Sequence, residues 1–397
     1  MIEFLNVQKV IVATKSLIVE GWRFLPHSYA IVNQWQLLAL SRRADIAVKV
    51  IDAPLYRPAW QLEEGLFEQR AEQALRSIET AKPDDRADAT LRIFVPFDLS
   101  PSRSHRTAVF GTSESQLIRR NHLSDLQMYE QLKRRSPPTN VTIITPTRWS
   151  AEGFYKAGFK NEQVLIIPHG VDIDTFHPMP GVGSQVRRKI SIAGGDFAFL
   201  SVGAMTGNKG IDLLLQAFAE VCRKFPNARL ILKGMDPLYK SKDLIFRSMQ
   251  SVSALDRQCV IDRMAYFGES FSNRKMAILY QAADAYVSPY RAEGFNLPVL
   301  EAAASGLPII CTGGGATDDF VTDEFARRIE STRVSRKIED EELSALQPSV
   351  EHLIALMSSA IEDESWRMRA TEAGPLHVRA NYTWDSAVDM LVRKLLY

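Results

Sequence analysis

The sequence contains few cysteines, and its positive and negative charges nearly balance. Only three of its 397 residues are cysteines, Cys222, Cys259 and Cys311, and none forms a Cys-x-x-Cys pair or stands at ligand spacing from a histidine. This pattern predicts buried thiols in a reducing compartment and argues against a disulfide scaffold or a zinc site. The 48 basic and 47 acidic residues leave a formal net charge of +1, so no nucleic-acid partner is expected.

Long apolar runs are also missing. No segment approaches the roughly 20 consecutive apolar residues that span a bilayer, and the first residues, MIEFLNVQKVIVATK, do not have the composition of a signal peptide. We therefore expect a cytoplasmic protein. Basic clusters at 119–120 and 133–135 are typical of solvated helix faces, and they leave open a weak peripheral association with the inner face of a membrane.

The chain instead alternates short apolar runs with amphipathic segments. This rhythm predicts an α/β protein with mostly parallel sheets and right-handed crossovers. In the first half a helix is expected at 28–43, with Ser28 as its N-cap. The expected strands of this half are KVIVAT (9–14), IAVKVIDA (46–53), LRIFVPF (91–97), TAVFGT (107–112) and VTIITPT (141–147).

A loop rich in Asp, Pro and Gly interrupts the alternation after His169, and its composition suits a linker between domains. The pattern then restarts with the strands FAFLSVGA, ARLILKG, DAYVSPY and LPIICT, separated by helices such as GIDLLLQAFAEVCRKF, and the chain is expected to end with helices. Two doubly wound, Rossmann-like domains with a central cleft are therefore predicted. Ligands of such sheets bind beyond the carboxyl ends of the strands.

The stretch YRAEGFNLPVLEAAASGLPIICTGGG carries the strongest functional signal. Pro298 fits the first turn of a helix that Gly306 closes, so the loop at 293–297 opens onto a helix N-terminus, where free N–H groups favour a phosphate. Glu301, one turn into this helix, leans back toward Glu293. Because a carboxylate matches a vicinal diol, two carboxylates beside an anion site fit a sugar nucleotide. Either glutamate alone is as well explained as an ordinary acidic residue at a helix start.

A second phosphate-binding candidate is VGAMTGNKGIDLLLQAF. A strand ends at Gly203, and Lys209 places an ammonium at the start of the next helix. The segment is no P-loop, because Asn208 and Gly210 flank the lysine where that motif needs Gly and then Ser or Thr. Taken alone, Lys209 resembles a solvated lysine, but beside the 293–301 loop it predicts a cation for a phosphate.

These residues resemble the family 4 retaining glycosyltransferases, which have the GT-B fold. The matching segments are PHGVDIDTFHP, VGAMTGNKGIDLLLQAF, YFGE and AEGFNLPVLEAAASGLPIICTGGG, and the Glu293-x7-Glu301 spacing matches the signature of the family. In the N-terminal half only the alternation and TPTRWSAEGFYKAGF match. The resemblance implies an acceptor-binding domain at 1–171, a nucleotide-sugar-binding domain at 172–382 and a last helix at 383–397 that packs back on the first domain.

The resemblance also implies roles for individual residues. Glu293 and Lys209 are the implied catalytic residues, since Glu293 would contact hydroxyls of the donor sugar and Lys209 would neutralise the diphosphate. Glu301 would hold the ribose diol. The further implied donor contacts are Gly203, Gly294, Phe295, Asn296 and Leu297 at the sugar and phosphates, and Phe267 and Gly268 near the base. No cofactor is expected, and no metal, because no acidic cluster has the pattern of a divalent metal site.

Two positions depart from the pattern of the family. Ala204 stands where a second diphosphate-binding arginine is common, and Gly111 stands where a histidine is common at a strand end. These departures put the geometry around the transferred sugar in question, while the donor site itself is still expected. The candidates to replace the missing groups are Arg148 and Arg23 for the cation, and His105 and His27 for the histidine.

The loop VEGWRFLPHSYA is expected to occupy the first strand-to-helix turn and to face the cleft. Trp22, Arg23, His27 and Ser28 in this loop are candidates to contact the acceptor or the diphosphate. Trp22 either stacks on a sugar or simply packs in the domain core, and the sequence does not decide between the two. His169, where the strand before the linker ends, completes the expected set of cleft residues.

The sequence thus predicts transfer of a hexosyl unit from a UDP-, GDP- or other nucleotide sugar to an acceptor hydroxyl. The resemblance implies retention of configuration, with the departing phosphate helping to deprotonate the acceptor. The acceptor is expected to be a saccharide, a lipid-linked sugar or another hydroxyl compound in polysaccharide, glycolipid or glycoconjugate synthesis. Two alternatives stay open: a sugar-nucleotide epimerase of the same fold, and a catalytically silent sugar-nucleotide-binding partner.

Overall fold

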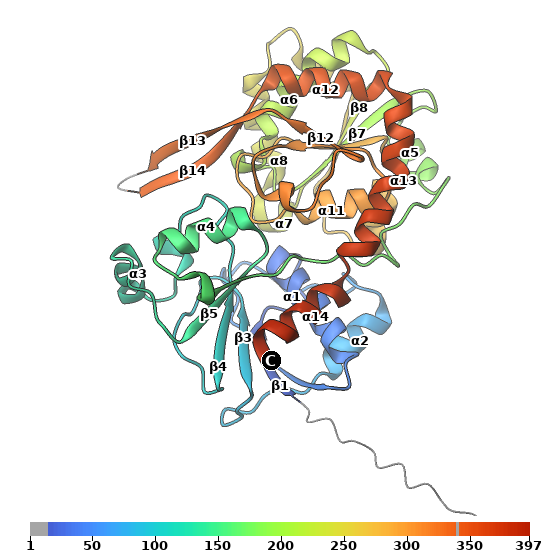
Figure 1. Cartoon of the computed structure of the whole chain (residues 1–397). Helices are drawn as coiled ribbons and strands as arrows, with labels where there is room; N and C mark the ends of the chain where they lie inside the picture. The colour runs from blue at the N-terminus through green and yellow to red at the C-terminus, as the bar shows by residue number, and fades with distance from the viewer. Residues whose placement is uncertain (1–14, 339–340) are drawn as a thin grey trace, which may run out of the picture.

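The computed structural model describes residues 15–338 and 341–397, which form two α/β lobes (Figure 1). Each lobe is built round a six-stranded sheet, ordered β2-β1-β3-β4-β5-β6 in the first lobe and β12-β11-β10-β7-β8-β9 in the second. Neighbouring strands within both sheets pair in parallel. The doubly wound α/β class expected from the alternation is confirmed. The strand expected at 9–14 lies outside the described residues.

The first lobe contains six strands and four α-helices among the described residues. Its buried strands are short apolar runs, and β3 is buried at every position, as is usual for a parallel strand covered on both faces. The elements are β1 (Lys15–Gly21), α1 (Ser28–Ser41), β2 (Ile46–Asp52), α2 (Gln69–Ser77), β3 (Ala89–Ile93), β4 (Arg106–Phe110), α3 (Leu126–Lys133), β5 (Val141–Thr145), α4 (Arg148–Lys156) and β6 (Val164–Ile166), with 3-10 turns at Arg120–His122 and Asn161–Gln163.

The second lobe repeats the alternation after an irregular linker. Its central strands β10 and β11 are completely buried. The elements up to the last parallel strand are α5 (Gly183–Lys189), β7 (Phe197–Val202), η3 (Gly207–Lys209), α6 (Ile211–Lys224), β8 (Ala228–Lys233), α7 (Asp236–Tyr239), α8 (Ser241–Ser248), η4 (Met249–Ser251), α9 (Arg257–Asp262), β9 (Met264–Phe267), α10 (Asn273–Tyr280), β10 (Ala285–Ser288), α11 (Leu297–Ala304), β11 (Ile309–Thr312), η5 (Ala316–Asp319) and β12 (Ala326–Ile329).

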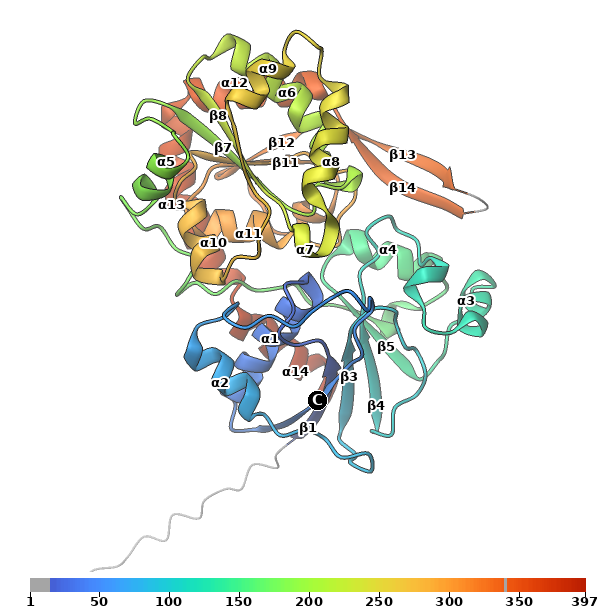
Figure 2. The same cartoon turned by 180° about the vertical axis from the view of Figure 1, so that it is seen from behind.

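Three long helices end the chain: α12 (Val350–Glu362), α13 (Glu364–Asn381) and α14 (Trp384–Leu396). The first two lie on the second lobe, whereas α14 lies against the first lobe beside α1 (Figures 1 and 2). Its apolar face, which includes Trp384 and Leu391, is part of the core of the first lobe. Val171 N donates to Tyr382 O at 2.9 Å, so the linker and the start of α14 cross side by side. The chain therefore passes between the lobes at two adjacent places, the linker and the segment before α14.

An antiparallel hairpin of β13 (Ser331–Ile338) and β14 (Glu341–Pro348), which was not predicted from the sequence, precedes the terminal helices. It projects from the second lobe toward α4 of the first (Figures 1 and 2). Ser344 N donates to Ser115 O at 2.9 Å, and Lys156 Nζ donates to Ser344 Oγ at 3.2 Å. Leu346 packs with Trp149 in a small buried cluster. The hairpin is therefore a clamp between the lobes.

Two local expectations need comment. His27, and not Ser28, is the N-cap of α1: its ring Nδ1 accepts the N–H of Tyr29 at 3.2 Å. All three cysteines are free thiols, and the sulfur atoms of Cys222 and Cys259 lie 2.7 Å apart. The N-terminus of α1 is thus capped by a histidine that also borders the cleft.

We expect Leu391→Ala in α14 to lower the free energy of unfolding by about 2–5 kcal/mol, because Leu391 is buried in the core of the first lobe and the variant leaves a cavity there. Urea denaturation measures the change. Arg393→Ala, on the exposed side of the same helix, is the control and should change stability by less than about 0.5 kcal/mol. Equal losses in the two variants would contradict the packing of α14 on the first lobe.

Candidate functional site in the interlobe cleft

The carboxyl ends of both sheets face each other across the cleft. Loops that follow β4 and β5 in the first lobe meet loops that follow β7 and β10 in the second. Thr147 Oγ1 donates to Gly294 O at 2.8 Å, and Asn208 Nδ2 donates to a carboxylate oxygen of Glu114 at 3.1 Å. The functional residues predicted at strand ends are therefore gathered between the lobes.

The loop after β10 opens onto the N-terminus of α11, as the sequence predicted. Asn296 precedes the helix in a left-handed conformation (φ 80°), and its side chain donates to Ser288 Oγ at 3.0 Å. Pro298 occupies the first turn. A side chain at Gly294 would collide with Thr112 of the first lobe, so only glycine permits this close approach. The N-terminus of α11 consequently lies at the cleft between the lobes, where Leu297 and Pro298 line a cavity.

Lys209 and Glu293 form an ion pair in the cleft. Lys209 ends the 3-10 turn η3, and Gly210 follows in a left-handed conformation (φ 69°) where a side chain would overlap the carbonyl of Pro289. Glu293 is 4% exposed. Burial acts to lower the pKa of Lys209, but the charges of Glu293 and Glu114 outweigh burial and leave that pKa raised. The lysine is therefore a permanent cation at this position.

Glu301 faces the same cavity from α11. The hydroxyl of Tyr280 on α10 donates to its carboxylate at 2.7 Å. Burial raises the pKa of Glu301 to about 7, although the hydrogen bond from Tyr280 opposes the shift. The second carboxylate oxygen of Glu301 is thus available to a ligand. Without a ligand hydroxyl, burial of the negative charge of Glu301 is unfavourable for the folded state.

The larger cleft cavity has a volume of about 400 Å³ and runs from Lys209 and Glu301 to the end of β8. Four predicted donor residues line it, Gly203, Lys209, Leu297 and Glu301, and so does Ala204. At its far end lie residues the sequence did not single out: Lys233, Gly234, Met235, Phe271, Asn273 and Met276.

Phe267 and Gly268, expected near the base, do not line this cavity. Gly234 N donates to Phe267 O at 2.8 Å, and the Phe267 ring packs 5.6 Å from the Phe271 ring. The two residues therefore support Gly234 and Phe271, which form the wall. Lys233, also in the wall, is buried with its Nζ over the Phe271 ring, and burial lowers the pKa of Lys233 to about 8.

A second cavity of about 330 Å³ opens in the first lobe and is called here the aromatic cavity. Trp22 lies in its wall, but its Nε1 donates to Pro54 O at 2.9 Å and its ring packs edge-on to Trp60, so the packing role is the one observed. Burial, with help from the charge of Arg57, lowers the pKa of His27 to about 4. The lining residues are Trp22, His27, Ser28, Tyr29, Tyr56, Arg57, Trp60, Val95, Phe97, Thr112, Glu114, Ser115, Leu117, Arg119, His122, Tyr239 and Leu343.

A connecting cavity of about 120 Å³ joins these regions and is lined by Glu293, Gly294, Phe295, Asn296 and His169, among others. The His169 ring packs 4.8 Å from that of Phe295, and burial lowers the pKa of His169 to about 3. Gly111 lies close to it at the end of β4, where the rings of Phe97 and Phe154 occupy the space of a side chain. Two phenylalanine rings thus fill the space that a histidine side chain would take at this position.

Besides Gly111, three predicted cleft residues do not line the cavities. Arg23 pairs with Asp52 through both Nε and Nη2 at 2.7 Å, at the carboxyl ends of β1 and β2. Arg148, whose side chain is 77% exposed, pairs with Asp319 of the second lobe at 3.1 Å. His105 is exposed at the start of β4, the opposite end of that strand from the cleft. The expectations that an arginine among these supplies the missing cation and that His105 replaces the missing histidine are therefore wrong.

Glu114 is the cleft residue that sequence reasoning missed. It lies in the loop after β4 and, with Ser28, lines all three cavities of the cleft. Its side chain is exposed to the cleft, yet atoms of both lobes crowd its carboxyl group; this crowding and the charge of Glu293 raise the pKa of Glu114, against the effect of Lys209. Its position just beyond a predicted strand end was the one available signal.

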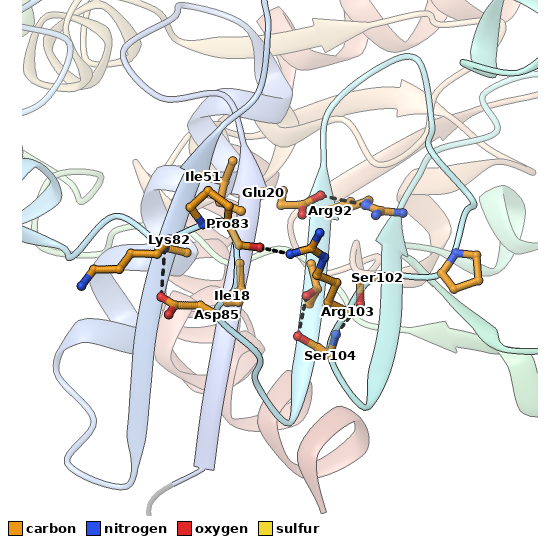
Figure 3. A pocket seen from close by; sticks show the side chains of 13 residues that line it. Ile18, Glu20, Ile51, Lys82, Pro83, Asp85, Arg92, Ser102, Arg103 and Ser104 are labelled. Carbon is orange, nitrogen blue, oxygen red and sulfur yellow. Dashed lines mark hydrogen bonds and ion pairs between the residues drawn. The ribbon is translucent and has the colours of Figure 1, made fainter.

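A polar cavity of about 390 Å³ lies away from the cleft, on the first sheet (Figure 3). Alternation along β1 places Ile18 and Glu20 on this face, while Leu17 enters the core. Arg92 donates to the Glu20 carboxylate at 2.7 Å, and Arg103 pairs with Asp84 on the loop beside it. None of the predicted site residues lines this cavity.

Two further properties bear on partners. Within residues 15–338 and 341–397, no three His, Cys, Asp or Glu side chains gather in a way that could hold a metal ion. None of the helices described there combines the length and the apolar character needed to cross a bilayer.

Part of this sequence is similar to known proteins. Residues 184–376 match the family model described as "Glycosyl transferases group 1". Mannosylfructose-phosphate synthase of Agrobacterium fabrum is 30% identical over 158 residues, which cover 39% of this chain and 34% of the relative. Lipopolysaccharide 1,2-N-acetylglucosaminetransferase of Salmonella typhimurium is 26% identical over 199 residues, 50% of this chain and 51% of the relative. The chain thus spans about a third to a half of these curated relatives.

Solved structures resemble the whole chain. Sucrose-phosphate synthase from Thermosynechococcus elongatus superposes with a TM-score of 0.66 at 17% identity, covering 96% of this chain and 98% of that one. Anabaena Alr3699/HepE, in complex with UDP and glucose, gives 0.68 at 14% identity, covering 96% and 99%. Identities this low establish the fold alone. The fold is GT-B, and residues 184–376 match the family model of group 1 glycosyltransferases.

We expect Glu301→Gln to be more stable than the unmodified protein at pH 8, by about 1–3 kcal/mol. The pKa of Glu301 in the folded protein, about 7, lies above the ordinary 4.5, so folding favours the protonated form. The stability that the protonated Glu301 carboxyl group contributes is complete below pH 4.5 and is lost as the pH rises through 7.

Urea denaturation at pH 5 and pH 8 measures this difference, which should shrink at pH 5. Glu372→Gln, an exposed residue of α13, is the matched control and should have no effect at either pH. A Glu301→Gln variant that is no more stable than the unmodified protein at pH 8 would contradict the burial of a charged carboxylate there.

Proposed function

We propose that this protein is a retaining, family 4 glycosyltransferase that moves a hexosyl unit from a nucleotide-diphosphate sugar to an acceptor hydroxyl. The observation that carries the proposal is the convergence of Lys209, Glu293 and Glu301 on one region of the cleft, at the N-terminus of α11. A cation and free helix N–H groups match a diphosphate, and two carboxylates match the hydroxyls on either side of it. The homology of residues 184–376 supports the same class of reaction.

In this proposal the donor occupies the larger cleft cavity. Lys209 and the α11 N-terminus hold the diphosphate, Glu301 holds the ribose diol, and the base lies against Gly234 and Phe271 at the far end. Glu293 then turns from Lys209 to hydroxyls of the sugar. Gly294 to Leu297 contact the sugar and phosphates through backbone groups, as the resemblance implies. The nucleotide is uridine- or guanosine-based or of another kind; the complex of the Anabaena neighbour with UDP and glucose makes UDP-glucose the first donor to try.

The proposed chemistry follows from where charge develops. As the bond between the anomeric carbon and the diphosphate breaks, negative charge grows on the leaving oxygen, and a fixed ammonium and aligned N–H groups stabilise that charge without reorganising. This requires no metal ion. The acceptor hydroxyl enters from the aromatic cavity, whose rings suit the faces of a saccharide or lipid-linked saccharide. A cytoplasmic location, with weak contact of the basic clusters with a membrane, completes the proposal.

Two other functions would use the same donor site, and one assay distinguishes them from sugar transfer. A sugar-nucleotide epimerase would convert the donor without an acceptor, and a silent binding partner would bind the donor without turnover. Labelled UDP-glucose, UDP-N-acetylglucosamine and GDP-mannose, each with and without saccharide acceptors, distinguish the three. Sugar transfer supports the proposal, whereas an isomerised nucleotide or binding without any turnover contradicts it.

We expect Lys209→Ala and Glu293→Ala each to lower the transfer rate by about 100-fold or more, because each removes a charged group from the place where the leaving group and the sugar meet. Circular dichroism should show that both variants remain folded. Lys189→Ala, an exposed lysine of α5, is the matched control and should transfer at the normal rate. Normal rates in both cleft variants would refute the site.

We expect Glu301→Ala to weaken binding of the nucleoside diphosphate by about 10–100-fold, because loss of charged hydrogen bonds to a diol costs about 1.5–3 kcal/mol. Isothermal titration calorimetry with UDP or GDP measures this directly, without any acceptor. Glu351→Ala, exposed on α12, is the control. Unchanged affinity in Glu301→Ala would remove the ribose role.

A further inference from the structure

Two cysteines of the second lobe meet at the contact between two helices. Cys222 lies in the last turn of α6 and Cys259 lies in α9, and these helices pack side by side (Figure 2). The two sulfur atoms are 2.7 Å apart, and both residues are free thiols. Neither residue lines the cavities described above, so the pair is separate from the proposed donor site.

The distance between the two sulfur atoms is close to that of a covalent bond. In a disulfide the sulfur atoms lie about 2.05 Å apart, and the observed separation exceeds that value by less than about 1 Å. Small rotations of the two side chains supply a change of this size. Because the helices already pack on each other, a bond between the two sulfur atoms requires no rearrangement of the second lobe.

The surroundings of the two thiols differ in a way that assigns them different roles. Cys259 is partly exposed, and Arg263 Nη1, one helical turn further on, donates to its Sγ at 3.2 Å. A guanidinium at this place stabilises the negative charge of a thiolate, which is the form that reacts with oxidants. Cys222 is 1% exposed, and burial and the contact with Cys259 raise the pKa of Cys222 to about 12. Cys259 is therefore the thiol that an oxidant meets first.

The third cysteine has no such partner among the described residues. Cys311 lies in the completely buried strand β11, and its Sγ is 3.5 Å from Thr317 Oγ1. Burial raises the pKa of Cys311 to about 12. Cys311 is thus shielded from oxidants and serves as an internal reference for the reactivity of the other two.

We propose that Cys222 and Cys259 form a modification site, at which a hydroperoxide closes a reversible disulfide between α6 and α9. The Cys259 thiolate attacks one peroxide oxygen, the O–O bond breaks, and the leaving oxygen departs as water with the thiol proton. The product is a sulfenic acid on Cys259. Cys222 then attacks the Cys259 sulfur and gives up its proton, the S–S bond forms, and the S–O bond breaks with release of a second water. Two thiols are oxidised, and one peroxide is reduced to two water molecules.

The disulfide would act on the stability of the second lobe. The segment between the two cysteines contains β8, α7, α8 and η4, and it includes Lys233, Gly234 and Met235 of the donor cavity wall. A cross-link that closes such a loop lowers the entropy of the unfolded chain and so favours the folded state. Disulfides inside cells are mostly transient and redox-sensing. The bond would therefore protect the second lobe against unfolding when the surroundings become oxidising, whatever reaction the cleft performs.

Peptide mapping of the full-length protein tests the proposal. The protein is treated with hydrogen peroxide, unfolded, alkylated with iodoacetamide and digested with trypsin. Cys222 and Cys259 then lie in the separate peptides 210–223 and 258–263, and Cys311 lies in 292–327. We expect the first two peptides to be joined, two hydrogen atoms lighter than their sum, and to separate on treatment with dithiothreitol. The peptide with Cys311 should stay alkylated. The cross-linked protein should remain a single chain on a non-reducing gel.

Two variants test the order of the reaction and the effect on stability. In Cys222→Ala the sulfenic acid has no partner, so dimedone should label Cys259, whereas in Cys259→Ser dimedone should not label Cys222. Peroxide should raise the melting temperature of the unmodified protein by about 5–10 °C and leave that of both variants unchanged. Dithiothreitol should reverse the rise.

Each outcome has a distinct meaning. Alkylation of both Cys222 and Cys259 after peroxide treatment would show that the two thiols only lie in contact, and it would overturn the proposal. A bond of either cysteine to Cys311 or to a second chain would overturn it as well. Dimedone on Cys222 in Cys259→Ser would reverse the assigned roles of the two thiols. A disulfide that leaves the melting temperature unchanged would contradict the stabilising effect. None of these results depends on whether the protein transfers sugar.

Discussion

The ion pair between Lys209 and Glu293 organises the cleft. The two residues are 84 positions apart in the sequence, but they follow β7 and β10, which are neighbouring strands of one parallel sheet. Glu293 is almost completely buried, so the ammonium is what permits its charge there. In the proposed donor complex the diphosphate takes the place of Glu293 beside Lys209, and the carboxylate is freed for sugar hydroxyls. The proposed roles of Glu301 and of the aromatic cavity depend on this exchange.

The protein holds these groups in place at some cost to local stability. Gly210 adopts a left-handed conformation and packs against the Pro289 carbonyl with no room for a side chain, and Asn296 adopts a left-handed conformation directly before α11. Glu301 keeps a carboxylate where burial disfavours its charge. Contacts between the lobes offset these costs: the hairpin β13–β14, the last helix and the bond from Thr147 to Gly294 each join residues far apart in the chain.

Much of the fold was predictable because the relevant signals are local. Apolar runs located the strands, and the Pro298 to Gly306 pattern located α11 together with its anion-favouring N-terminus. The hairpin was missed because its sequence, STRVSRKI and EELSALQP, is rich in charge, and its buried Leu346 packs against residues of both lobes that are distant in the sequence. Glu114 was missed because its importance comes from three cavities that exist only after the lobes meet. Arg23 failed as a cation because its distant partner Asp52 cannot be read from spacing.

The most direct test is a crystal structure of the protein with UDP-glucose or its UDP product bound. The account predicts that the diphosphate lies between Lys209 Nζ and the first turn of α11, that the Lys209–Glu293 pair has separated, and that both ribose hydroxyls contact the Glu301 carboxylate. A diphosphate bound elsewhere, with the ion pair intact, would contradict the account.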